Sequence, residues 1–101
     1  MDKKLVLQAK KHDKEAFVKL VENYQVSMYK TAIAILQNDE DAADAIQETI
    51  LICWEKIGSL RNAKFFKTWM TRILIHRCYA IYNENLSLIH ISEPTRPEPI
   101  S

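Results

Sequence analysis

The stretch DKEAFVKLVENYQVSMYKTAIAI, residues 13–35, decides the fold of this chain because its apolar side chains recur at helical spacing. Most steps between them are of three or four residues, and the positions are Phe17, Leu20, Val21, Tyr24, Met28, Ala32 and Ile35. Such a stripe covers one face of an α-helix over about five turns. Asp13 is well placed as its N-cap, because a carboxylate there accepts hydrogen bonds from first-turn amides. We expect this helix to end at Gln37 and Asn38, with Asp39 capping the next one.

Three other segments flank this helix and have similar patterns. A short helix is expected over about residues 3–11, with Asp2 as its cap. The next is expected over about residues 40–57, with Gly58 as a left-handed C-terminal cap. Its apolar stripe consists of Ala43, Ile46, Ile50, Cys53, Trp54 and Ile57. After a connector over residues 59–63, a last helix holds Phe66, Trp69, Met70, Ile73, Leu74 and Ile81.

Helix breakers are almost absent from the first nine tenths of the chain. The 101 residues include one glycine, and the three prolines all lie between Pro94 and Pro99. We therefore expect an all-α fold over residues 1–83, a compact bundle of three long helices plus a short N-terminal helix. A bridge between Cys53 and Cys78 is feasible, but reduced thiols in a cytoplasmic protein are favoured.

Residues 84–101 differ in composition from the rest of the chain. Helical periodicity stops at about Glu84, and the Ser-Glu-Pro-Thr-Arg-Pro-Glu-Pro stretch does not propagate a helix. Leu86–Pro97, LSLIHISEPTRP, resembles a translated sequencing-adapter read-through. We therefore expect residues 84–101 to be a disordered tail of non-native sequence.

Opposite charges occupy adjacent segments, although the net charge is only +1. Residues 39–55 hold six acidic side chains and no basic one, whereas residues 58–83 hold five basic side chains, His76 and no acidic one. In the first segment, carboxylates and an amide surround a leucine that is expected to be exposed. These residues are Asp44, Gln47, Glu48, Leu51 and Glu55. This face suits a helical partner with basic side chains, although a solvated surface is the common alternative.

The second segment mixes basic and aromatic residues, namely Arg61, Lys64, Phe65, Phe66, Lys67, Trp69, Arg72, His76, Arg77 and Tyr79. Basic groups hold phosphates and flat side chains stack on unpaired bases, so this combination favours single-stranded nucleic acid over duplex. Phe66 and Ile73 are expected in the core, whereas Trp69 fits either environment.

Three motifs in this order and spacing resemble region 2 of sigma-70 family RNA polymerase sigma factors of the extracytoplasmic-function (ECF) type. Lys14–Tyr24 is similar to region 2.1, Asp41–Ile57 to the D-A-x-D-x-x-Q-E pattern of region 2.2, and Phe66–Ile73 to the F-x-T-W-L-x-R-I pattern of regions 2.3 and 2.4. The resemblance implies the fold of that domain. It also implies binding to core polymerase and to the promoter −10 element as single-stranded nontemplate DNA, with an anti-sigma factor as a further partner.

Residue roles follow from the resemblance position by position. The face that docks on the β′ clamp helices corresponds to Asp41, Asp44, Gln47, Glu48, Leu51 and Glu55. The connector and last helix that bind DNA correspond to Arg61, Asn62, Lys64, Phe65, Lys67, Thr68, Trp69, Arg72, His76 and Arg77. The family's N-x-x-x-D-x-x-R pattern is altered, since His76 and Ala80 occupy its first two positions and the arginine is missing. Members of this family also carry a region 4, which the given sequence does not contain, and we therefore expect a truncated gene model.

Three other classes of function compete with this interpretation. An enzyme is not expected, because no catalytic residues, glycine-rich phosphate loop, cofactor motif or metal-ligand spacing is found. A helix-turn-helix that reads duplex DNA is disfavoured by the 18-residue length of the third helix. A helical protein-interaction module that never touches DNA is the remaining alternative. It leaves Lys64, Phe65 and Lys67 unexplained.

Overall fold

A computed structural model describes residues 2–92 of the chain, and this part is built from helices. The four α-helices are α1 (Asp2–Lys10), α2 (Lys14–Leu36), α3 (Asp39–Lys56) and α4 (Phe66–Ser92). Two short 3₁₀ turns, η1 (Ile57–Ser59) and η2 (Ala63–Phe65), join α3 to α4. The all-α expectation, with three long helices and a short N-terminal one, is confirmed.

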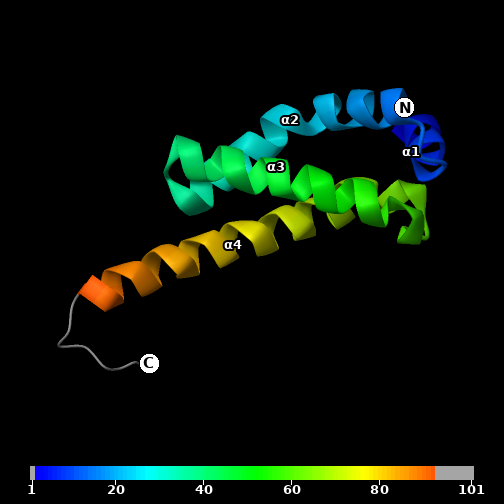
Figure 1. Ribbon diagram of the computed structural model, residues 1–101. Helices are drawn as coiled ribbons and strands as arrows, with labels where there is room; N and C mark the ends of the chain where they lie inside the picture. The colour runs from blue at the N-terminus through cyan, green and yellow to red at the C-terminus, as the bar shows by residue number, and fades with distance from the viewer. Residues whose placement is uncertain (1, 93–101) are drawn as a thin grey trace.

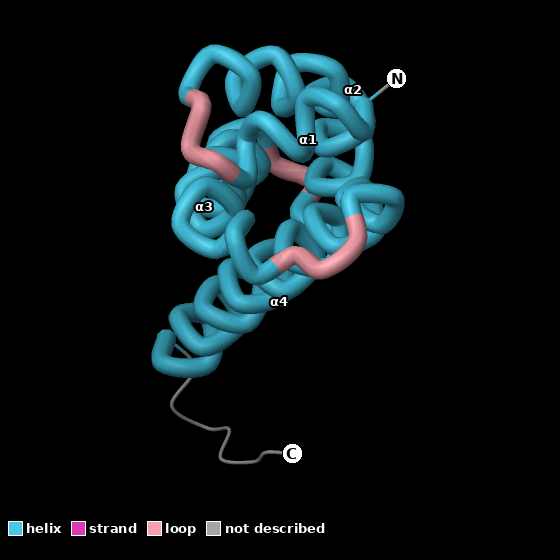
Figure 2. Tube along the Cα trace, turned by 90° about the vertical axis from the view of Figure 1, so that its right-hand side faces the viewer, coloured by secondary structure: helices cyan, strands magenta, loops and turns pink. Residues whose placement is uncertain are grey.

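The three long helices pack against one another, so each contributes to a shared core. α2 and α3 run antiparallel, and α4 crosses beside both (Figure 1). α1 packs against α2 and also contacts η1 and η2, which closes the end of the bundle where the α3–α4 connector lies (Figure 2). The connector is therefore held against folded structure on one side and open to solvent on the other.

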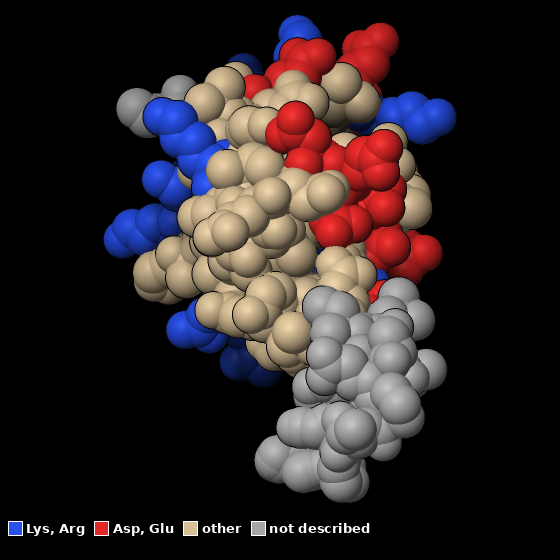
Figure 3. Space-filling view, turned by 90° about the vertical axis from the view of Figure 1, so that its left-hand side faces the viewer, with Lys and Arg blue, Asp and Glu red and all other residues tan. Residues whose placement is uncertain are grey.

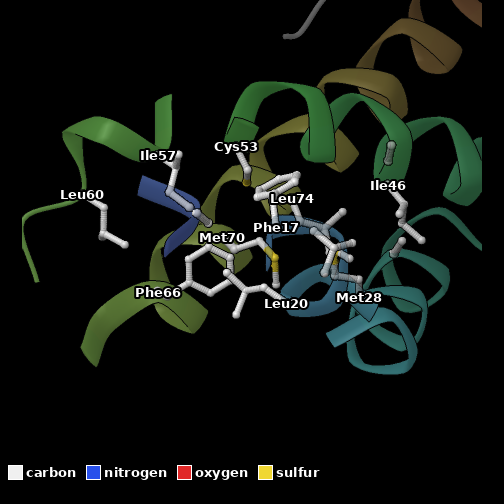
Figure 4. Packing of buried hydrophobic residues seen from close by; sticks show 14 of the residues in the cluster. Phe17, Leu20, Met28, Ile46, Cys53, Ile57, Leu60, Phe66, Met70 and Leu74 are labelled. Carbon is white, nitrogen blue, oxygen red and sulfur yellow. The ribbon is translucent and has the colours of Figure 1, made fainter. Parts of the chain in front are cut away.

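The core is filled by the stripes that the sequence predicted, with few exceptions. Phe17, Leu20 and Met28 of α2 meet Phe66, Met70 and Leu74 of α4, with Cys53 and Ile57 from the α3 side (Figure 4). Ala43 was placed in the α3 stripe but is exposed, whereas Ala42 and Thr49 are buried. At these positions the buried face of α3 is shifted by one residue from the face that the sequence predicted. Thr49 is tolerated inside because its hydroxyl donates to the Ala45 carbonyl at 2.7 Å.

Helix termini show which local signals were interpreted correctly. Asp13 caps α2 as predicted, its carboxylate accepting from the Ala16 amide at 3.3 Å. The cap of α3 is Asn38 and not Asp39, because the Asn38 side chain accepts from the Asp41 amide at 2.9 Å. Asp39 instead accepts a hydrogen bond from the Tyr29 hydroxyl, which ties the start of α3 to α2 and raises the pKa of Tyr29.

Gly58 does not act as a left-handed cap, contrary to the prediction. No glycine among the described residues has a positive φ, and Gly58 lies within the η1 turn that continues the right-handed path of α3. The Leu60 amide closes this turn on the Ile57 carbonyl at 3.1 Å. The left-handed conformation occurs instead at His12, between α1 and α2, and at Gln37, where α2 ends.

α4 extends beyond the expected boundary near residue 83 and ends at Ser92, so its predicted end was too early. Residues 84–92 contain no glycine or proline, and a helix already nucleated by packing propagates through such a segment. The Asn85 amide donates to the Asp41 carboxylate at 3.0 Å, which links this extension to α3. The disorder expected for residues 93–101 falls outside the described part of the chain.

Replacing Asn38 with alanine tests the observed cap. We expect the free energy of unfolding to fall by about 1 kcal/mol, because the first turn of α3 loses its side-chain acceptor. Asn38→Ser, which retains an acceptor, is the matched control and should stay within a few tenths of a kcal/mol of the parent. Urea titration followed by circular dichroism measures both. Equal losses in the two variants would rule out capping by Asn38.

Candidate functional site

An acidic stripe runs along the outer side of α3. The stripe consists of Asp41, Asp44, Glu48, Leu51 and Glu55, and each of these residues is three or four positions after the one before it. Gln47 lies beside the stripe. Leu51 is 63% exposed, which is unusual for a leucine on a helix that already has a buried face. In Figure 3, acidic side chains gather on the right of the displayed face, and most of the basic ones lie on the left. A polar rim around an exposed apolar residue is the composition of a docking surface.

A groove of about 750 Å³ lies along α4 beside α3. It is lined by Ile52, Leu60, Phe65, Thr68, Trp69, Arg72, Ile73, His76 and Arg77. The groove exists because α4 turns its Phe66–Met70–Leu74 row inward. That leaves the neighbouring rows of the helix facing outward along α3.

The aromatic side chains of the groove are presented in two ways. Phe65 is 57% exposed at the junction of η2 and α4. Trp69 is half-buried and packs on the buried Phe66, with ring centroids 5.9 Å apart. Trp69 therefore occupies both environments, since one part of the indole supports the core while another lines the groove. Ile73 is half-buried and also lines the groove, while Phe66 lies in the core as expected.

The other residues predicted to bind DNA lie on the approach to the groove. Arg61, Lys64 and Lys67 are exposed on the connector and the first turn of α4 but do not line the groove. The Asn62 side chain accepts from the Lys64 amide at 3.0 Å and thereby caps η2. The structure therefore shows a local structural role for Asn62, and the three basic side chains form a cationic approach.

The structure joins two residues that were assigned to different partners. Arg77 Nε donates to Glu48 Oε1 at 2.7 Å, and Nη2 of the same guanidinium forms an ion pair with that oxygen. The residues are 29 positions apart in sequence, and both are half-buried. Glu48 belongs to the acidic stripe of α3 and Arg77 lines the groove, so this pair connects the two surfaces.

Sequence reasoning missed two of the apolar groups that complete the groove. Ile52 and Leu60 contribute to its wall, and neither was named individually as a DNA-binding residue, although Leu60 belongs to the connector that was expected to bind DNA. Ile52 gave a signal, since it lies outside the main apolar stripe of α3 and had no core position to fill. Leu60 gave only its place in that connector, because its burial depends on how the connector folds back onto the bundle.

The side chains of these surfaces are suited to binding a ligand. Within residues 2–92 there is no cluster of three or more side chains of the kind that could hold a metal ion. In the same range, no helix is long and apolar enough to cross a membrane. Cys53 and Cys78 are free and buried, and burial raises the pKa of the Cys53 thiol to about 12, which keeps it protonated at neutral pH. Exposed cations near aromatic rings suit a polyanionic ligand that also carries flat groups able to stack on the rings.

Comparisons with known proteins agree with the fold. Residues 20–84 match the family model for Sigma-70 region 2. The chain is 34% identical over 73 residues to the ECF RNA polymerase sigma factor SigW of Bacillus subtilis, and 31% identical over 75 residues to the RNA polymerase sigma-H factor of Pseudomonas aeruginosa. These matches cover 72% and 74% of the chain but 39% of each relative, so the chain spans about two fifths of their length.

A solved structure is also similar. It is the NMR structure of the complex formed by an engineered region 2 of sigmaE with GTAAAA. The TM-score is 0.76 at 25% sequence identity, over 83% of this chain and 87% of the other. The likeness therefore extends over most of the helical bundle.

Proposed function

Because the chain belongs to the Sigma-70 region 2 family, we propose that it acts in transcription initiation, binding core RNA polymerase through α3 and unpaired promoter DNA through the α4 groove. The observation that carries the proposal is the groove itself, in which aromatic and basic side chains lie together beside a cationic approach. Both partners of this activity are found in the cytoplasm, where we place the protein. The role requires no catalytic chemistry.

The groove suits a single strand better than a duplex. Flat side chains stack on bases only where the bases are unpaired, and Phe65 and Trp69 each present a ring toward the groove. Arg61, Lys64 and Lys67 supply phosphate contacts along the approach. The sigmaE region 2 structure, solved in complex with GTAAAA, supports assigning this ligand class to the same fold.

Melting follows from differential binding. Unstacking a base costs a few kcal/mol, and stacking on an aromatic side chain returns about 1–3 kcal/mol per base. A protein that binds the open strand and not the duplex therefore shifts the equilibrium toward the open form. His76 lines the groove where the family pattern has asparagine, so we propose a −10 base preference that differs from that of members with asparagine.

The α3 stripe is the proposed site for the β′ clamp helices. Its carboxylates and the Gln47 amide offer acceptors to basic side chains, and Leu51 offers an apolar anchor at the middle of the stripe. Electrostatic complementarity of this kind sets register and speeds association, while the buried apolar anchor supplies affinity.

Replacing Asp44, Gln47 and Leu51 together with alanine tests the docking assignment. We expect affinity for core polymerase to fall at least about tenfold, since the anchor and its flanking acceptors are removed. The bundle should melt at the parental temperature, because all three side chains are exposed. Surface-bound core polymerase measures the affinity. Val26→Ala on α2, 69% exposed in the parent, is the matched control for loss of an exposed apolar side chain.

Alanine substitution of Lys64, Lys67 and Arg72 tests the DNA assignment. Binding to a labelled single strand should weaken, and its dependence on log salt should flatten by about 0.7 for each phosphate that is no longer neutralised. Fluorescence anisotropy over a salt series measures the slope. Lys19→Ala and Lys30→Ala remove exposed lysines of α2 and should leave the slope unchanged. Equal affinity of the parent for single strands and duplex would instead support a protein-interaction module without DNA function.

A further inference from the structure

We infer that Arg77 contacts an unpaired base and not a phosphate, and that Glu48 is the residue that positions it. This inference rests on the proposed binding of single-stranded DNA in the α4 groove. It assigns to Arg77 a role different from that of the exposed basic residues. It also gives Glu48, a member of the α3 stripe, a function in the DNA site.

The contacts fix the orientation of the guanidinium. Nε and Nη2 of Arg77 both meet Oε1 of Glu48, the Nε contact being 2.7 Å long. A guanidinium has five N–H groups in a rigid plane, so two contacts on one edge determine where the other edge points. The three N–H groups that do not meet Glu48 remain available for a ligand in the groove that Arg77 lines.

The charges decide which part of the DNA Arg77 serves. Phosphate binding gains most of its free energy when an unbalanced cation displaces condensed counterions from the strand. Arg77 is already balanced by Glu48, so it offers little net charge for that exchange. A paired guanidinium still donates hydrogen bonds to base edges and stacks on flat rings, and these contacts distinguish bases.

The apolar surroundings of Arg77 also favour a base over a phosphate. Trp69, Ile73 and Arg77 are four residues apart and form one row of α4, which Ile52 of α3 faces across the groove. Trp69, Ile73 and Ile52 are half-buried and apolar. A phosphate brought among them would lose hydration, whereas a base would gain apolar contact. Arg72, by contrast, is exposed and keeps an unbalanced charge for phosphates.

The proposed role of Glu48 is compatible with the α3 stripe. Both contacts to Arg77 use Oε1, so Oε2 remains an acceptor for a partner's basic side chain. One carboxylate then touches both surfaces. Glu48 is accordingly left out of the variant that tests polymerase docking.

Arg77→Met and Glu48→Gln in the full chain test the inference, with labelled oligo(dA), oligo(dT) and oligo(dC) as probes over a salt series. Arg77→Met keeps an unbranched stem and should weaken binding to the preferred probe by about tenfold with an unchanged salt slope. Glu48→Gln keeps an acceptor but unbalances the guanidinium. We expect it to steepen the slope by up to about 0.7 and to reduce the difference between probes.

The double variant separates positioning from general stability. If Glu48 acts on DNA through Arg77, Glu48→Gln should change neither slope nor base preference in the Arg77→Met background. Melting temperatures of all three variants show whether each is folded, and Arg77→Lys replaces Arg77→Met if the latter is not. Arg77→Lys should lose base preference while keeping its charge.

Two results overturn the inference. A salt slope that flattens in Arg77→Met, as it is expected to do in the alanine variant of Lys64, Lys67 and Arg72, would place Arg77 on a phosphate. Undiminished affinity in Arg77→Met would leave the pair with a structural role only. In both cases the parent still binds single strands, so the proposed function stands. Absence of single-strand binding by the parent would overturn the proposed function together with the inference.

Discussion

The packing of α4 against both α2 and α3 is the constraint on which the rest of the structure depends. Phe66, Met70 and Leu74 point inward and are almost completely buried, and they meet Leu20 and Met28 from α2 in the core (Figure 4). Once this row is fixed, the helical repeat leaves no choice for the neighbouring rows. Trp69 and Ile73 must lie at the border with α3, and Arg72 must face solvent. The same helix therefore supplies the core and the wall of the groove.

The connector between α3 and α4 depends on this packing as well. Leu60 is buried, and η2 is capped by Asn62, so the short segment follows a defined path with its basic side chains outward. α1 contacts both 3₁₀ turns and supports the connector from the other side. A cationic approach is thus held at the entrance of the groove by local hydrogen bonds and by burial of one leucine. A flexible loop would lose more conformational entropy on binding a strand.

The ion pair between Glu48 and Arg77 shows how the two surfaces depend on each other. Charge segregation along the chain suggests an acidic face and a basic face with separate partners, and most of the exposed residues agree with that division. The pair is the exception, because α3 and α4 lie side by side and bring one member of each face into contact. A formal charge in the sequence is therefore not the charge that a ligand meets. Arg72 and Arg77, five residues apart, differ in this respect.

Much of this protein was determined by the sequence alone. The apolar stripes of α2 and α4, the cap at Asp13 and the three motifs in register predicted an all-α bundle and a family that the comparisons confirm. These features are local, since helical periodicity and capping depend on neighbours within a few residues.

Tertiary structure decided what depends on residues far apart in the chain. The extension of α4 is tied to α3 by the hydrogen bond between Asn85 and Asp41, which are 44 positions apart. The groove wall at Ile52 and Leu60 and the neutralisation of Arg77 required α3, the connector and α4 to be placed together. Spacing along one helix specifies a face. Only packing between helices specifies what that face meets.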